Sequence, residues 1–478
     1  MKRAAVIIGL GIAAYYALIL TNGRMNLWTP ALAPGWTGWH RVLGFTFNSM
    51  LLHLLRGEFD VDPEAIQWEA VITGDGKTYA YFGIVPALVR LPLLPFFDLR
   101  TTDVSALTCL AAVILAAAAK LGALQTIATH VPDASARRPA LVAVAVVIVL
   151  GGAQLQFLRV TVYQEAILWA GALAAVFVAV SVRGLVVRRP FSTRRLAALA
   201  ILAGLAVLTR VSTGVGLCVA TLALVACATA RDAGAARARL ARALVPLAAL
   251  ALLAVLAGVV NYARFGDALT FHAPAWQTLT HPHGIPALAH YGPFDVRRLP
   301  YGVMYYFAPV WFVPGPDGVA PFAAFRERAI DLVELPPSSF LLSDPLLVLL
   351  AAMGGALLLG RGPVAWDRPA ARTLALGFAV PPVLILTAFV MAFRYRMEFY
   401  PLLEFLAFVA LAFSPRLARA GGSPAWRRTL GALMVVSVVM SHAVVLLYKT
   451  SVLGSVPPGE VVGLYRTYLW NAVAKFLP

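Results

Sequence analysis

Long apolar segments recur along the whole chain, and they constrain its fold more than any other feature. The chain has 478 residues, only 13% of them charged, and its mean hydropathy is +0.80. A run of about 18 or more apolar residues is long enough to cross ~30 Å of hydrocarbon as a helix. We therefore predict an all-α polytopic membrane protein with eleven transmembrane helices, near residues 4–21, 104–126, 139–158, 165–186, 195–209, 212–230, 243–262, 343–360, 373–392, 400–413 and 429–448.

The distribution of charge predicts the orientation of these helices. If the N-terminus is cytoplasmic, the cytoplasmic segments carry 20 of the 39 basic residues and only three of the 22 acidic ones. This asymmetry is the bias expected from the positive-inside rule. The net charge of +17 is thus explained by topology, and nucleic acid is not predicted as a partner. The remaining 19 acidic residues place the working groups on the outer, periplasmic face of a bacterial inner membrane.

Two outer segments are much longer than the other outer turns. Residues 22–103 and 264–342 contain apolar stretches that proline interrupts and that are too short to span a membrane. Such stretches are typical of amphipathic helices that lie in the headgroup plane. We predict one transmembrane domain over residues 1–448 that includes both outer segments, followed by a short extracytoplasmic tail at residues 449–478.

The first outer segment holds the densest group of acidic residues in the chain. Glu58, Asp60, Asp62, Glu64, Glu69 and Asp75 lie within 18 residues of one another. A carboxylate beside a hydrophobic boundary is suited to act as a general base. We place the base among Asp60, Asp62 and Glu69, and we assign substrate binding to the adjoining Lys77, Tyr79 and Tyr81. A solvated acidic loop or a cation site is the alternative interpretation.

Four arginines follow the predicted outer ends of helices: Arg210, Arg264, Arg394 and Arg396. Arginine at this depth is unfavourable unless an anion pairs with it, and its planar fork matches a phosphate. We predict that these residues bind a donor phosphate. The alternative is that they extend toward outer lipid headgroups.

Two further features have competing interpretations. Glu165 begins a predicted helix, so it either faces a polar cavity as a substrate-binding residue or stabilises the helix N-terminus. The second outer segment contains four histidines, His272, His281, His283 and His290, but without the spacing of a zinc site on a helix. We interpret them as ordinary loop residues and predict neither a metal nor another cofactor.

Several of these stretches, taken in order, resemble the GT-C superfamily of membrane glycosyltransferases. They are L-L-H-L-L-R-G-E-F-D and D-G-K-T-Y-A-Y-F-G-I-V-P-A-L within residues 51–88, Y-Q-E-A-I-L-W at 163–169, the Thr209-Arg210 junction, N-Y-A-R-F-G-D-A-L-T-F at 261–271, and R-Y-R-M-E-F-Y-P at 394–401. The resemblance implies a polyprenyl-phosphate sugar as donor and an acidic residue of the first outer loop that activates the acceptor. In many members an Asp precedes the G-K-x-Y stretch. Here Glu69 occupies that region and Asp60 and Asp62 lie further upstream, which leaves the base open.

Together these features predict an inverting, metal-independent glycosyltransferase. It would transfer a hexose or pentose from a polyprenyl phosphate to a lipid or glycan acceptor at the periplasmic face, in contact with membrane lipids. One alternative is a transporter or flippase for lipid-linked glycans, which would need ionisable residues deep in several helices, whereas the sequence places only Lys120 well inside one. Another is a polymerase or ligase of surface polysaccharide, which would use a pyrophosphate-linked donor.

Overall fold

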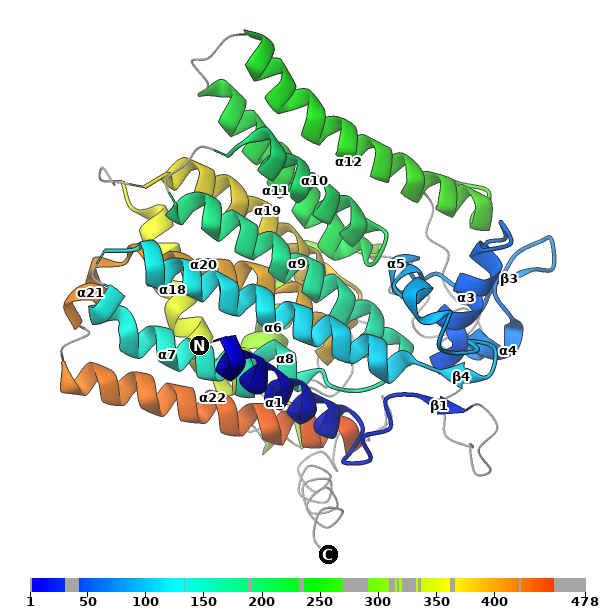
Figure 1. The fold of residues 1–478 in the computed structure, drawn as a ribbon, viewed down its shortest axis with the longest axis horizontal. Helices are drawn as coiled ribbons and strands as arrows, with labels where there is room; N and C mark the ends of the chain where they lie inside the picture. The colour runs from blue at the N-terminus through cyan, green and yellow to red at the C-terminus, as the bar shows by residue number, and fades with distance from the viewer. Residues whose placement is uncertain are drawn as a thin grey trace, which may run out of the picture. The chain divides into compact units, whose positions relative to one another are not determined.

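The computed structural model describes residues 2–30, 43–132, 134–187, 191–231, 236–269, 291–308, 314–315, 318–319, 332–333, 337–361, 366–420 and 423–450. Within these ranges nearly all regular structure is helical, which confirms the predicted all-α class (Figure 1). The chain divides into two compact units. Unit 1 comprises residues 1–118, 158–177 and 191–281, and unit 2 comprises residues 119–157, 178–190 and 282–478.

Every predicted transmembrane segment contains a helix. These helices are α1 (Lys2–Leu20), α6 (Ser105–His130), α7 (Ala134–Leu150) with the short α8 (Gly152–Gln156), α9 (Val162–Val186), α10 (Thr193–Val207), α11 (Val211–Ala230), α12 (Ala236–Phe265), α18 (Pro345–Leu359), α19 (Arg368–Thr387), α20 (Tyr400–Phe413) and α22 (Pro424–Thr450). Within the described ranges, seven helical segments are long and apolar enough to cross a membrane, with α7 and α8 counted as one. The protein is therefore a multi-pass membrane protein, and the number of eleven spans stays a prediction.

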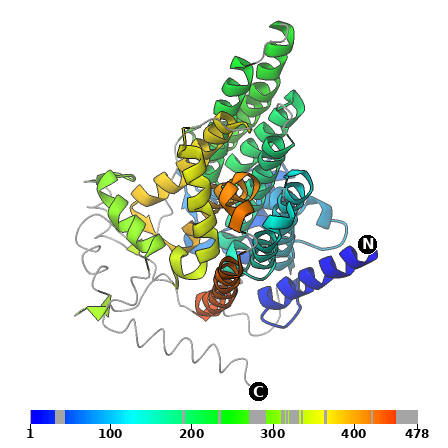
Figure 2. The same ribbon diagram turned by 90° about the vertical axis from the view of Figure 1, so that its left-hand side faces the viewer.

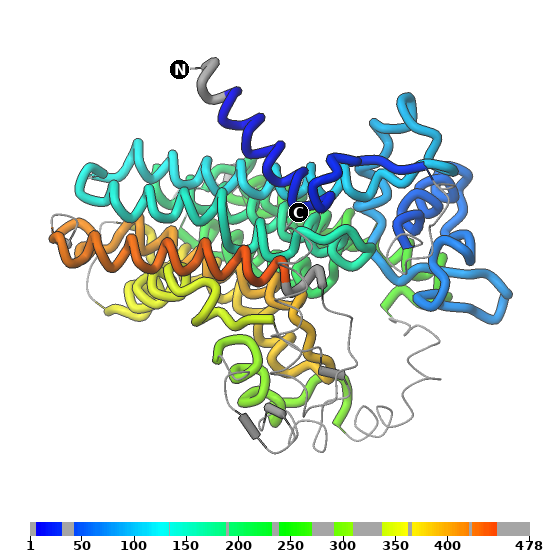
Figure 3. The backbone as a smooth tube through the Cα atoms, turned by 90° about the horizontal axis from the view of Figure 1, so that it is seen from below, coloured from blue at the N-terminus to red at the C-terminus, as the bar shows by residue number. Residues whose placement is uncertain are grey.

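Glycine allows close helix packing in both units. In unit 1, α10 lies between α11 and α12 (Figure 1), and a Cβ on Gly204 of α10 would come within 2.4 Å of the Leu253 side chain on α12. In unit 2, α18 packs along α20 (Figure 2), and a Cβ on Gly354 would lie 1.9 Å from the carbonyl oxygen of Leu406. A side chain at either position would force the helices apart, as is typical of small residues at helix contacts in membranes. The long α22 lies beside α7 in the same unit (Figure 3).

The first outer segment folds into short elements with a common core. They are β1 (Thr29–Pro30), η1 (Leu43–Phe45), α3 (Thr46–Leu54), α4 (Pro63–Ile66), η2 (Gln67–Glu69), β2 (Val71–Ile72), β3 (Thr78–Tyr79), α5 (Val85–Leu88), η3 (Leu91–Leu93) and β4 (Thr102–Asp103). Strand β1 pairs antiparallel with β4, and β2 pairs antiparallel with β3. Phe47 and Leu51 of α3 are buried in one cluster with Val162 of α9 and Val260 of α12. This apolar core fixes the segment on the ends of long helices of unit 1.

The helices and strands in the described parts of the second outer segment, and in the connections of unit 2, are also short. They are η4 (Val296–Arg298), α15 (Leu299–Phe307), β5 (Pro314–Gly315), β6 (Gly318–Val319), β7 (Leu332–Val333), α17 (Phe340–Ser343), β8 (Val390–Met391), η6 (Phe393–Glu398) and α21 (Pro415–Ala420). Strands β5 and β6 pair antiparallel, and β7 and β8 pair parallel. The four histidines of this segment, and residues 451–478 of the predicted tail, lie outside the described residues.

Candidate functional site

The acidic stretch after α3 runs back along that helix because the chain reverses at Gly57. Gly57 has a φ of +78°, a left-handed conformation that glycine adopts without a steric penalty. The backbone N–H groups of Gly57 and Glu58 donate to the carbonyl oxygens of Leu54 and His53, at 3.0 Å each, which closes the helix end. As a result, residues 58–62 pass beside the side chain of His53.

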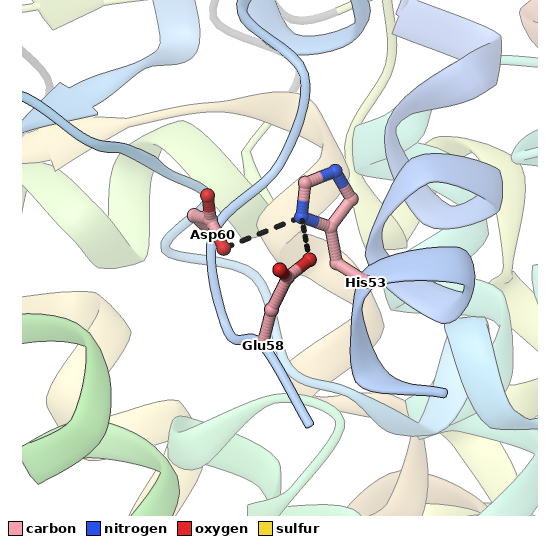
Figure 4. Close-up of side chains that lie close together, drawn as sticks. All are labelled: His53, Glu58 and Asp60. Carbon is pink, nitrogen blue, oxygen red and sulfur yellow. Dashed lines mark hydrogen bonds and ion pairs between the residues drawn. The ribbon is translucent and has the colours of Figure 1, made fainter. Parts of the chain in front are cut away.

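His53 is the centre of a cluster of three carboxylates. Its Nδ1 lies 3.3 Å from Oε2 of Glu58 and 3.3 Å from Oδ1 of Asp60, and Figure 4 shows these two acids on the same side of the ring. Its Nε2 lies 3.3 Å from Oδ1 of Asp62. The structure thus brings together two of the three predicted bases. His53 was not singled out from the sequence, and the available signal was a histidine between two Leu pairs, L-L-H-L-L, just before the acidic stretch.

Asp62 is positioned from two sides and remains accessible. The Ser49 hydroxyl donates to Asp62 Oδ2 at 2.7 Å, and the Asp62 backbone N–H donates to Ser49 Oγ at 2.8 Å. The side chain is 59% exposed, compared with 19% for Asp60. Desolvation by burial raises the pKa of the Asp62 carboxyl, but the hydrogen bonds from Ser49 and His53 and the charges of His53 and Arg56 outweigh it. The net pKa lies below the ordinary value, so Asp62 is a carboxylate near neutral pH.

A cavity of about 590 Å³ opens beside these groups. Its lining combines apolar side chains, the polar side chains that hold Asp62, and charged groups: Phe45, Ser49, Leu52, His53, Arg56, Asp62, Glu64, Ala65, Leu99 and Arg100. A volume of this size suits a sugar or lipid headgroup, since small-molecule sites usually enclose about 300–1,000 Å³. Among the three predicted bases, only Asp62 lines this cavity.

The same cluster is the group of described residues that has the composition of a metal site. One nitrogen of His53 and one carboxylate oxygen each of Glu58 and Asp60 lie within 4.8 Å of one another. Zinc sites use these atom types. However, His53 Nδ1 already contacts both carboxylates, and Arg56 Nε donates to Glu58 at 2.8 Å. The cluster is therefore satisfied by its own hydrogen bonds and ion pairs.

Glu69 lies in a different environment from Asp60 and Asp62. It is 1% exposed, and it accepts hydrogen bonds from the hydroxyl of Tyr81, at 2.7 Å, and from the hydroxyl of Tyr163 at the start of α9. Gln67, two residues earlier, has a φ of +47°, which is uncommon for a residue with a side chain. The predicted base Glu69 and the predicted substrate-binding residue Tyr81 thus contact each other.

Lys77 and Tyr79 belong to a hairpin that Asp75 organises. Asp75 Oδ1 accepts from the Lys77 backbone N–H at 3.0 Å, its Oδ2 accepts from the Tyr79 hydroxyl at 3.0 Å, and the Thr73 hydroxyl also donates to it. Burial and the hydrogen bond to Asp75 raise the pKa of Tyr79 to about 12. The Lys77 side chain is exposed at the turn, while Tyr79 is buried against the ring of Phe265.

Glu165 is occupied by a partner that the sequence did not reveal. Both of its oxygens accept from Arg90, at 2.6 and 2.9 Å, and neither side chain is exposed. The Thr108 hydroxyl donates to Glu165 at 2.5 Å, and Arg90 Nε donates to Asn48 Oδ1 at 2.8 Å. This bidentate pair joins α9 to the first outer segment. Glu165 therefore has a structural role and does not line the cavity.

The four predicted phosphate-binding arginines divide between the two units. In unit 1, Arg264 at the end of α12 is 5% exposed and donates to the Phe82 carbonyl oxygen at 2.8 Å, while its buried Nε has no hydrogen-bond partner among the described residues. Arg210 is half-buried and precedes α11. In unit 2, Arg394 is half-buried over the ring of Tyr395. Arg396 is buried and donates to Asp344 at 2.7 Å.

Comparisons with known proteins describe the outline of this fold. No family model matches the sequence, and no curated protein matches it. Over 96% of its length the chain resembles the solved oligosaccharyltransferase of Archaeoglobus fulgidus, crystallised with a tethered acceptor peptide, at a TM-score of 0.45 and 14% identity, and it spans 59% of that protein. Over 99% of its length it resembles ArnT from Cupriavidus metallidurans bound to undecaprenyl phosphate, at a TM-score of 0.42 and 14% identity, and it spans 79% of that protein.

The fold and the site therefore define an all-α, multi-pass membrane protein with a carboxylate-lined cavity on a juxtamembrane segment.

Proposed function

We propose that the protein is a membrane glycosyltransferase that moves a sugar from a polyprenyl phosphate to a hydroxyl of a lipid or glycan acceptor. The observation that carries this proposal is the cavity beside α3, in which Ser49 and His53 hold an accessible carboxylate, Asp62. The surrounding segment packs on the ends of α9 and α12, where the headgroup of a lipid-linked sugar would lie. The charge distribution of the sequence supports a periplasmic site in a bacterial inner membrane.

In the proposed reaction Asp62 acts as the general base. Its carboxylate takes the proton of the acceptor hydroxyl while that oxygen attacks C1 of the donor sugar. The bond between C1 and the phosphate oxygen breaks, and the lipid phosphate leaves with the electron pair. Attack from the face opposite the leaving group inverts the configuration at C1. Ser49 and His53 orient the carboxylate, so the base is preorganised before the acceptor binds.

The leaving phosphate needs a positive charge, and we assign this role first to Arg264. Its guanidinium is buried, and within the described part of the chain its Nε has no hydrogen-bond partner and its side chain forms no ion pair with a carboxylate. Arg264 Nη2 also lies 3.5 Å from Met50 Sδ on α3, the helix that carries Ser49 and His53. Arg396, in contrast, is already paired with Asp344. Arg210 and Arg394 remain further candidates for the donor site.

Replacement of Arg264 should weaken donor binding. A hydrogen bond to a charged group contributes about 1.5–3 kcal/mol, so Arg264→Ala should raise the dissociation constant for a polyprenyl-phosphate sugar by about tenfold or more. Arg264→Lys should recover only part of the loss, because an ammonium lacks the planar fork. Binding is measured on purified protein in nanodiscs. Arg24→Ala, which changes an exposed arginine away from the cavity, is the matched control.

The proposal itself is tested by reconstitution. Purified protein in liposomes receives a radiolabelled polyprenyl-phosphate sugar and a crude glycolipid fraction as acceptor, and chromatography separates labelled product, free lipid phosphate and unreacted donor. We expect label in the acceptor, with a monophosphate donor active and its pyrophosphate counterpart inactive. Activity with the pyrophosphate-linked donor alone would indicate a polymerase or ligase instead.

One observation favours the transporter alternative, and the same reconstitution experiment tests that alternative. Lys120 of α6 and Glu404 of α20 form a largely buried ion pair inside unit 2, so the expectation that only Lys120 lies well inside a helix was wrong. Buried ionisable residues in membrane helices are often functional. A flippase would move the labelled lipid from the inner to the outer leaflet without breaking its bond to the sugar. Movement of intact donor in the absence of any transfer would therefore contradict the proposed activity.

A further inference from the structure

One cationic side chain in the cavity lining has no carboxylate partner within the described part of the chain. Arg100 lines the same cavity as Asp62, and its side chain is exposed in the turn that precedes β4. The other lining arginine, Arg56, donates to Glu58. Arg100 is therefore the lining cation whose charge is available to a ligand.

The backbone on both sides of Arg100 is held by one residue of α3. Asn48 Nδ2 donates to the carbonyl oxygens of Leu99, at 2.9 Å, and Thr102, at 2.7 Å. Asn48 is fully buried, and its Oδ1 accepts from Arg90, the partner of Glu165. Asp98 Oδ1 closes the turn by accepting from the Arg100 backbone N–H at 3.0 Å. The turn is thus fixed to α3 by two hydrogen bonds from the buried Asn48 side chain.

The next residue of the same helix holds the proposed base. Ser49 exchanges two hydrogen bonds with Asp62, while Asn48 anchors the turn of Arg100. Two consecutive residues of α3 therefore fix the backbone positions of a cation and of a carboxylate on one cavity. A solvated rim arginine would not require a turn tied to the helix that positions the base.

We propose that the acceptor is anionic, and that Arg100 binds a phosphate or carboxylate group of the acceptor while Asp62 receives its hydroxyl. This inference rests on the proposed function. Arginine is suited to the role because its two parallel N–H groups match a phosphate or a carboxylate. The cavity volume of about 590 Å³ accommodates a headgroup that carries both a hydroxyl and an anion. The charged group orients the acceptor so that the hydroxyl, rather than the anion, meets Asp62.

The test measures binding without transfer, so that it can fail or succeed independently of the proposed activity. Full-length protein in phosphatidylcholine nanodiscs is titrated by saturation-transfer NMR with glycerol 1-phosphate, which has both groups, with glycerol, and with inorganic phosphate. We expect the wild type to bind glycerol 1-phosphate at least about tenfold more tightly than glycerol. Arg100→Ala should reduce this preference to less than about threefold, and Arg100→Lys should retain part of it.

Control variants and a second lipid composition show whether the preference belongs to Arg100. Arg24→Ala should keep the full preference, and Arg100→Ala should unfold at the same temperature as the wild type because its side chain is exposed. An unchanged preference in Arg100→Ala, or no preference in the wild type, would overturn the proposal. So would loss of the preference in nanodiscs that contain phosphatidylglycerol, because the bulk lipid headgroup would then be the ligand. If the preference is present but no transfer is detected, the anion site stands and the proposed function fails.

Discussion

Asp62→Asn is expected to reduce the rate of sugar transfer by about 10²–10⁴-fold while donor binding stays near normal. Positioned general bases contribute about this factor, and the amide keeps the shape of the carboxylate but cannot take the proton. The Ser49 hydroxyl can still donate to the amide oxygen, so the local structure should persist. Single-turnover transfer from a polyprenyl-phosphate sugar in liposomes measures the chemical step, and a separate titration measures donor affinity.

Three further variants locate the base by comparison. Asp267→Asn removes an exposed carboxylate of unit 1 that does not line the cavity, and it should leave the transfer rate unchanged. Asp60→Asn should cost less than Asp62→Asn, because Asp60 contacts the other nitrogen of His53 and is less exposed. If Asp62→Asn kept near-normal turnover, the base would have to be reassigned to Asp60 or Glu69, according to whether Asp60→Asn or Glu69→Gln lost activity.

The pH dependence of the transfer rate should reflect the protonation of Asp62. Its pKa lies below the ordinary value, so the carboxylate persists at pH values where a free aspartate, with a pKa of about 3.9, begins to take up a proton. As the pH is lowered, the transfer rate should therefore decrease only once the pH is below about 4. Replacing Ser49 with Ala removes a hydrogen bond that lowers this pKa, so this decrease should shift to higher pH. A shift to lower pH, or none, would contradict the role of Ser49.

The second large effect is expected at the buried pair of Arg90 and Glu165. Glu165→Gln should lower the free energy of unfolding by about 3–5 kcal/mol, because it leaves the Arg90 guanidinium without a counterion in a site that excludes water. The measurement is reversible unfolding by SDS in mixed micelles, followed by circular dichroism. Transfer activity per folded molecule should change much less than stability does.

A double replacement distinguishes a structural pair from a substrate-binding residue. Arg90→Met combined with Glu165→Met removes both charges and keeps apolar volume, and it should recover most of the stability lost in Glu165→Gln. If Glu165 instead binds substrate, the single Gln variant would lose donor or acceptor affinity while its unfolding free energy stayed at the wild-type value. That result would restore the substrate-binding role that its position at a helix start suggested.

The prediction of helices succeeded because membrane spans depend on local composition. A segment of apolar residues long enough to cross the bilayer must satisfy its backbone hydrogen bonds internally, so its sequence alone predicts a helix. The separation of α7 from α8 around Gly151 and Gly152 is a detail that hydropathy did not predict. The short helices of the first outer segment were expected as a type, but hydropathy could not define their ends.

The partners of the predicted site residues were much harder to obtain from the sequence. Asp60 and Asp62 were chosen for their chemistry and their position after an apolar segment, and the structure places both against His53. Glu69 was chosen on the same grounds, yet the structure buries it under the hydroxyls of Tyr81 and Tyr163. Carboxylates that are close in sequence therefore differ in their access to the cavity, and sequence spacing does not encode that difference.

By itself, the sequence determined that this protein is a helical membrane protein and that a group of its acidic residues lies between membrane helices. These properties follow from composition and from spacing along the chain. Only the tertiary structure decided that Asp62 lines a cavity and that Arg90 neutralises Glu165 from 75 residues away. It also decided that Asn48 fixes the backbone beside Arg100 and that Ser49 fixes Asp62. Such contacts join residues distant in sequence, and they form because the apolar core of α3 and the ends of α9 and α12 bring those residues together.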